Sequence, residues 1–149
     1  MKKTIIIASL ILGFILISIL GYGFRPASFD SAKENKEMNF YKGSLKEAMT
    51  KAKEENKLIF LDVYATWCGP CKLLKTTTFT EPDVAKYFNK NFISLEINSE
   101  DHVGLEIVKK YDLKNHPSLL FIDSDGKLIK KSLGYYNGKQ LLEIAHNLK

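Results

Sequence analysis

Cysteine is scarce in this chain of 149 residues, where only Cys68 and Cys71 are present. Two cysteines cannot build the multi-bridge framework of a small secreted scaffold, and they cannot supply a four-cysteine zinc site. A large excess of one charge is also absent. Beyond Phe24 the sequence contains 20 of the 22 lysines and arginines and all 17 acidic residues. So mild an excess, spread along the chain, argues against a dedicated nucleic-acid binder. The composition, 45% hydrophobic and 26% charged, is that of a folded protein with one domain.

Acidic residues are missing from the first two dozen positions, where an uncharged run of 21 residues, Thr4 to Phe24, follows Lys2 and Lys3. As a helix this run would span roughly 32 Å, enough to cross the hydrocarbon core of a bilayer. A helix buried in the core of so small a domain would instead carry polar residues on one side. We therefore predict an N-terminal hydrophobic helix, a transmembrane segment over residues 1–24 that attaches the chain to a membrane.

The two N-terminal lysines place that end of the segment in the cytoplasm, so the rest of the chain is expected to be exported. The apolar run is longer than that of a typical signal peptide, and Gly21 and Gly23 make a poor cleavage site. An uncleaved signal-anchor is therefore favoured over a cleaved signal peptide. Residues 25–39 are polar without an apolar period and are expected to be a linker, which leaves residues 40–149 as the domain.

Helices and strands are expected to alternate beyond the linker. A capping box of Ser44 and Glu47 starts a helix that Asn56 ends, and the apolar run Leu58–Tyr64 is typical of a strand buried on both faces. The later elements are expected as helix, strand, helix, strand, strand and helix: Pro70–Phe79 with a second helical piece from Thr80, Phe92–Ile97, Asp101–Tyr111, Leu119–Asp123, Lys127–Lys131, and a last helix capped by Asn137. Alternation followed by a hairpin predicts an α/β fold with a mixed sheet covered by helices on both faces.

The two cysteines form a C-x-x-C motif at the point where a strand gives way to a helix. A cysteine attacks as its thiolate, and the free N–H groups and dipole of a helix start stabilise a negative sulfur at Cys68. Pro70 suits the first helical turn, and Gly69 allows close approach of the backbone. Cys71 lies about one turn further on, where it can attack a mixed disulfide formed at Cys68. This spacing predicts that Cys68 is an exposed nucleophile and Cys71 the resolving thiol.

Two other readings of the motif remain open. The pair could form a static structural disulfide, although a bridge that closes so short a loop stabilises little. It could also be half of an intermolecular metal site with His116 as a third ligand. The flanking strand and helix favour the redox reading.

The segment Trp67–Lys72, preceded by Asp62–Ala65, resembles the active site of the thioredoxin superfamily. His116-Pro117-Ser118 resembles the loop that holds this family's cis-proline, and Gly134 with Gly138–Leu141 resembles its last turn and helix. The stretch Thr78–Val84 is similar to thioredoxin-like modules of envelope proteins, such as the C-terminal reducing domain of DsbD-type thiol:disulfide interchange proteins. The resemblance covers Tyr41 to Lys149 and implies a thioredoxin fold.

The resemblance also implies roles for single residues. Asp62 would be the family's buried acid that exchanges a proton with Cys71, unless it is an exposed aspartate at a sheet edge. Pro117 would be cis and would present the backbone of residue 116 to an extended substrate. Trp67 would shield the disulfide and contact the substrate, the alternative being plain core packing, and Gly69 and Pro70 would belong to the same contact surface.

His116 departs from the family, which usually carries a small or branched residue before the cis-proline. An imidazolium near Cys68 would favour the thiolate and raise the reduction potential, but the ring could equally face solvent. The family's lysine on the strand next to the buried acid is also missing, since Phe92–Ile97 contains none.

These observations predict an extracytoplasmic thiol–disulfide oxidoreductase that reduces protein disulfides and is held at the inner membrane with its domain in the periplasm. Its partners would be disulfide-containing client proteins and a membrane electron donor of the DsbD type, and no cofactor or metal is expected. The alternatives are an oxidase or isomerase using the same site, or a copper-binding or client-delivery module for cytochrome or oxidase assembly. A copper module would need soft ligands nearby, yet Met1, Met38 and Met49 are remote from the motif in sequence.

Overall fold

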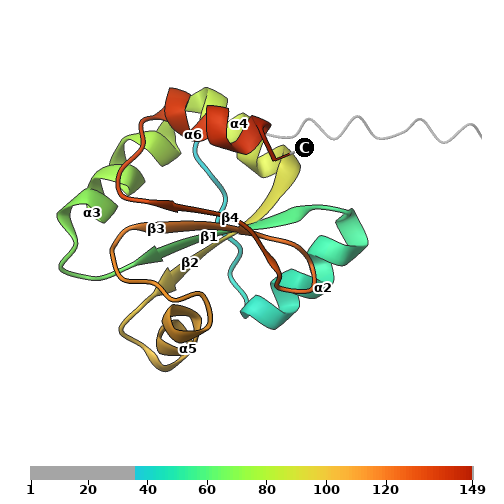
Figure 1. Cartoon of the computed structure of the whole chain (residues 1–149). Coiled ribbons are helices and arrows are strands. Elements are labelled where there is room, and N and C mark those ends of the chain that lie inside the picture. Colours follow the sequence, from blue (N-terminus) through green and yellow to red (C-terminus); the bar gives the residue numbers. More distant parts are fainter. Residues whose placement is uncertain (1–35, 149) are drawn as a thin grey trace, which may run out of the picture. The chain divides into compact units, whose positions relative to one another are not determined.

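The computed structural model describes residues 36–148, which contain one four-stranded sheet with the strand order β2-β1-β3-β4 (Figure 1). β1 (Leu58–Tyr64) runs parallel to β2 (Phe92–Asn98). β3 (Ser118–Ile122) is antiparallel both to β1 and to β4 (Leu128–Leu133). The predicted mixed sheet is therefore confirmed.

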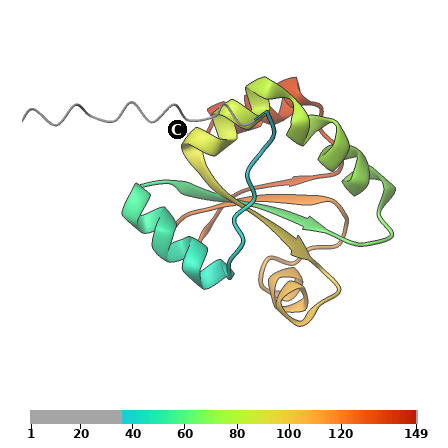
Figure 2. The same cartoon turned by 180° about the vertical axis from the view of Figure 1, so that it is seen from behind.

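Helices cover both faces of this sheet, which Figure 2 shows from the opposite side. α2 (Leu45–Glu55) and α5 (His102–Lys110) lie on one face, and α3 (Gly69–Thr76), α4 (Pro82–Asn91) and α6 (Gly138–His146) lie on the other. Alternate residues of β1 point to opposite faces because side chains in a strand have a period of two. Ile59, Leu61 and Val63 therefore pack with α2 and α5, whereas Phe60 packs with α3, α4 and α6. By the same alternation Asp62 faces the side of α3.

The expected helix caps are present. Ser44 and Glu47 form a complete capping box at the start of α2, and Asn56 ends this helix with a left-handed backbone, φ 50°. Asn137 caps α6 through a second box with Gln140. At the β3–β4 turn Gly126 has φ +79°, a conformation that glycine adopts without a steric penalty.

The helix that carries Cys71 is shorter than expected. It was predicted to run to Phe79, but α3 ends at Thr76 and a 3-10 turn, Thr78–Thr80, follows. The hydroxyls of Thr76 and Thr77 donate to helix carbonyls, at 3.0 Å to Lys72 and 2.7 Å to Leu73. Threonine side chains compete in this way for the backbone of a helix, which explains the early end.

Packing against the domain already involves Met38, within the expected linker. Its side chain is buried, and its N–H donates to the Phe79 carbonyl at 2.9 Å. The expected hydrophobic helix of residues 1–24 lies outside the described residues. Among residues 36–148, no helix has the length and apolar character needed to span a membrane.

Candidate functional site

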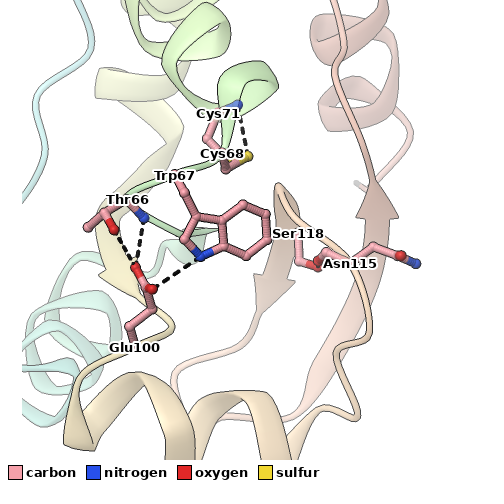
Figure 3. The surroundings of a disulfide bond; sticks show 7 residues. All are labelled: Thr66, Trp67, Cys68, Cys71, Glu100, Asn115 and Ser118. Carbon is pink, nitrogen blue, oxygen red and sulfur yellow. Dashed lines mark hydrogen bonds between the residues drawn. A yellow bond between two sulfur atoms is a disulfide. The ribbon is translucent and has the colours of Figure 1, made fainter.

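Cys68 and Cys71 form a disulfide at the N-terminus of α3 (Figure 3). Cys68 is the N-cap residue of the helix, and its sulfur accepts the Cys71 N–H at 3.2 Å. Pro70 occupies the first turn, where its missing N–H costs no helical hydrogen bond. The motif therefore places the Cys68 sulfur at the positive end of the helix dipole, where a thiolate is stabilised.

Exposure does not distinguish the two cysteines in this oxidised state. Cys68 is 3% exposed and Cys71 is 4% exposed, so the expectation of an exposed nucleophile is wrong for the disulfide form. The reason is packing, since both cysteines cluster with Ala65 and with the partly buried Tyr64. Their environments differ in another way: Cys68 caps the helix, whereas Cys71 lines a cavity beneath it.

Trp67 lies on the surface beside the disulfide and is held by Glu100. The indole is 71% exposed, which excludes core packing as its role. Its Nε1 donates to Glu100 Oε1 at 3.1 Å, while Glu100 Oε2 accepts from the Thr66 N–H at 2.8 Å and from the Thr66 hydroxyl at 2.7 Å (Figure 3). These hydrogen bonds, first the one from the Thr66 N–H, lower the pKa of Glu100. Glu100 therefore fixes the orientation of both residues that precede Cys68.

The His116–Pro117 peptide bond is cis and lies directly before β3. Ser118, the first residue of β3, pairs with Val63 in β1, so the loop reaches the strand end that leads into the cysteine motif. The His116 ring is half-buried and meets the Trp67 ring edge-on, with centroids 6.0 Å apart. Gly134, with φ +91°, donates its N–H to the Pro117 carbonyl at 2.9 Å and so braces the loop.

Asp62 is buried and lines a cavity together with Cys71. It is 2% exposed, and its Oδ1 has no hydrogen-bond partner among the described residues. The alternative of an exposed edge aspartate is excluded, because β1 is a central strand. Burial, and next the Glu96 carboxylate, raise the pKa of Asp62 to about 7, while Lys75 acts in the opposite direction. Asp62 can thus exchange a proton near neutral pH.

A cavity of about 110 Å³ connects Asp62 and Cys71 to the surface and is also lined by Lys75 and Glu96. Lys75 Nζ donates to Glu96 Oε1 at 2.7 Å. The sequence contains no lysine on β2, but α3 supplies one from the helix side. Lys75, Glu96 and Glu100 were not predicted from the sequence as residues of the site.

The structure thus brings together all the residues expected at the site, with Trp67, Gly69, Pro70 and His116 on the outer part and Asp62 with Cys71 at the cavity. No group of three or more potential metal-ligating side chains occurs within residues 36–148. His116 contacts Trp67, and its Nδ1 is a buried atom that lacks a hydrogen-bond partner among the described residues.

Comparison with known proteins agrees with this geometry. Residues 45–149 match the family described as a thioredoxin-like domain. The solution structure of a candidate disulphide-isomerase from Bacteroides thetaiotaomicron superposes with a TM-score of 0.68 at 38% identity, covering 75% of this chain and 93% of that one. The oxidised C-terminal domain of Neisseria meningitidis DsbD gives a TM-score of 0.60 at 27% identity, covering 75% of this chain and 99% of that one.

The curated relatives are much longer proteins. The thiol:disulfide interchange protein DsbD of Neisseria meningitidis serogroup A is 27% identical over 121 residues, which are 79% of this chain and 20% of the relative. That of Pseudomonas fluorescens is 30% identical over 83 residues, 55% of this chain and 14% of the relative. The chain therefore spans a fifth or less of the length of these two relatives. It belongs to the thioredoxin-like domain family, and its two cysteines form a disulfide at the start of α3.

Proposed function

We propose that this chain is a thiol–disulfide oxidoreductase that reduces disulfides of client proteins through Cys68 and Cys71. The observation that carries the proposal is the disulfide itself: one sulfur caps the start of α3, and the other cysteine shares a cavity with Asp62, a buried carboxyl group whose pKa is raised to about 7. A structural disulfide would need neither the helix start nor the buried acid.

In the proposed cycle the reduced chain begins with a Cys68 thiolate. This thiolate attacks one sulfur of the client disulfide, and the other client sulfur leaves as a thiolate. Asp62 then takes the proton of the Cys71 thiol, and the Cys71 thiolate attacks the Cys68 sulfur. The bond between Cys68 and the client breaks, so the client has gained two electrons and the chain is left with its own disulfide.

The client strand is proposed to lie along the outer surface of the motif. The indole of Trp67, fixed by Glu100, stands next to the nucleophile, and the His116 ring packs edge-on against it, so we expect the His116 backbone before the cis-proline to be accessible beside the motif. An extended client segment could pair with this backbone while its disulfide approaches Cys68. Gly69 and Pro70 are exposed and leave room for that approach.

Continuous turnover needs an electron donor, because Cys68 and Cys71 are the chain's only cysteines. We propose a membrane protein of the DsbD type as donor, and a chain anchored in the inner membrane by residues 1–24 with its domain in the periplasm. The uncharged 21-residue run after two lysines supports the anchor. The names of the curated relatives support the exchange chemistry.

Two serine variants test the assignment of roles. Cys71→Ser should accumulate a mixed disulfide with a disulfide-bonded protein such as insulin, because the resolving thiol is gone. Cys68→Ser should form none, and both variants should lose catalytic turnover of insulin with dithiothreitol. A mixed disulfide on Cys68→Ser, or turnover retained by either variant, would contradict the proposal.

A further inference from the structure

The cavity beneath the disulfide has a charged rim that the proposed cycle does not use. Its wall includes Cys71 and Asp62 at the inner end, and Lys75 with Glu96 nearer the surface. Lys75 has 63% of its side chain exposed, while the Glu96 side chain is 18% exposed. The ion pair therefore stands between the buried carboxyl and bulk water.

Glu96 is a direct neighbour of Asp62. The two residues are register partners in the parallel strands β1 and β2, and adjacent strands are about 4.8 Å apart, so both carboxyl groups lie on the face covered by α3. Two carboxylates this close disfavour each other's charge. Lys75, one turn beyond Cys71 on the same helix face, compensates part of this repulsion.

The other groups that face Asp62 do not form an ion pair like that of Lys75 and Glu96. The remaining titratable side chains that line the cavity are Tyr64 and Lys72, and the β3 residue opposite Asp62 is the apolar Leu119. Asp62 Oδ1 has no hydrogen-bond partner within the described part of the chain, and Asp62 lines the cavity, so the cavity offers a path for its proton. A cavity of about 110 Å³ holds several water molecules, enough to connect Asp62 to the rim.

We propose that Lys75 and Glu96 are positioning residues that set the charge state of Asp62 from the solvent side, and that the proton of Cys71 leaves through the rim they form. This inference rests on the proposed function. In the resolving step Asp62 receives the proton as the Cys71 thiolate attacks Cys68. Asp62 then returns the proton to water at the rim, which restores its carboxylate without any further oxidant or reductant.

The test uses the reduced full-length chain and dithiobis-nitrobenzoate, a disulfide that releases one coloured thiolate in each of two steps. The first release reports the attack by Cys68, and the second reports the resolving attack by Cys71. Rates of both phases are measured by stopped flow as a function of pH. One experiment therefore distinguishes effects on the attack by Cys68 from effects on proton transfer at Cys71.

The pH midpoint of the second phase is expected to shift in opposite directions when Glu96 and Lys75 are substituted. Glu96→Gln removes the repelling charge, so the second-phase midpoint should move down by about one pH unit, with a severalfold lower plateau because Asp62 becomes a weaker base. Lys75→Met removes the compensating cation, so the midpoint should move up by about half a pH unit, a smaller effect because this side chain is largely exposed. The first phase should keep its rate in both variants.

The ion pair Lys51–Glu55 on α2, with Nζ and Oε1 2.6 Å apart, offers matched controls that do not line the cavity. Lys51→Met and Glu55→Gln should leave both phases unchanged. Unchanged midpoints in the rim variants, or shifts in the same direction, would overturn the inference while leaving the proposed function intact. Absence of the first phase in the unmodified chain would instead overturn the proposed function.

Discussion

The polar groups on the two sides of the Cys68–Cys71 disulfide differ in burial and in hydrogen bonding. On the outer side, Trp67, Thr66 and Glu100 form a hydrogen-bonded surface next to His116. On the inner side, Asp62 lies buried in a cavity with Cys71 and has an unpartnered Oδ1 among the described residues. The outer side is held by fixed hydrogen bonds, and the inner side contains a carboxyl group whose pKa lies near neutrality.

The carboxyl groups of Asp62 and Glu100 show this difference most clearly. Three hydrogen bonds at the surface lower the pKa of Glu100, so it stays ionised and acts as a permanent acceptor. Burial raises the pKa of Asp62 to about 7, so it can gain and lose a proton near neutrality. The same chemical group thus becomes a permanent hydrogen-bond acceptor or a group that titrates near neutral pH, according to solvation and partners.

The largest expected effect comes from Asp62→Asn, which removes the proton carrier and keeps the shape. The resolving step should slow about 100-fold at neutral pH, the scale of general base catalysis. The loss should shrink above the ordinary thiol pKa of about 8.5, where Cys71 ionises without help. Stopped-flow release of the second thiolate from an aromatic disulfide measures this, and an unchanged rate would show that Asp62 carries no proton.

The same variant should alter how stability depends on pH. Because the pKa of Asp62 is raised from 3.8 to about 7, the folded chain holds a proton that the unfolded chain loses above about pH 4. The contribution of Asp62 to the free energy of unfolding is therefore most favourable below about pH 4 and falls as the pH rises to 7, by up to roughly 4 kcal/mol.

Asp62→Asn should remove this decline. The oxidised variant should match the unmodified chain at about pH 4 and exceed it in stability by a few kcal/mol at about pH 8. Denaturant unfolding at both pH values measures the difference. A constant difference between the two proteins across this range would contradict the raised pKa of Asp62.

On the outer side, Glu100→Gln should have a smaller effect of a different kind. The amide can accept fewer of the three hydrogen bonds, so Trp67 becomes less well oriented and kcat/KM for a protein disulfide should fall about fivefold. The pH midpoint of the resolving step should stay the same. A shifted midpoint would show that the two sides of the disulfide are not independent.

The smallest expected effect is that of His116→Ala. The half-buried ring lies against Trp67, and a positive charge there would favour the Cys68 thiolate. Its removal should lower the reduction potential by about 10 to 30 mV, which equilibration in glutathione buffers resolves. An equal or higher potential would mean that the ring acts only by packing.

The sequence predicted the residues that lie close together along the chain. Cys68, Cys71, Trp67 and Asp62 fall within ten consecutive positions, where a strand and a helix start place them without help from the rest of the fold. The alternation of helices and strands, followed by a hairpin, was enough to predict the mixed sheet with helices on both faces.

Two of the missed residues, Glu96 and Glu100, lie on or just after β2, which is distant in sequence from the cysteine motif. Glu100 follows β2, 33 residues after Trp67, and only the parallel pairing of β1 and β2 brings both strand ends to the same edge of the sheet. Glu96 is the one charged residue of β2, a signal that could have marked it as a neighbour of Asp62. Lys75 could have been recognised from its spacing of four residues from Cys71 on the helix.

The reduction potential of the full-length chain tests the central claim most directly. Equilibration in dithiothreitol or glutathione buffers, followed by the fluorescence of Trp67, the single tryptophan, yields this value. A potential near about −270 mV, as in thioredoxin, is expected for a reductase. A potential near about −120 mV, where strong oxidants lie, would show that the chain inserts disulfides and would contradict the account.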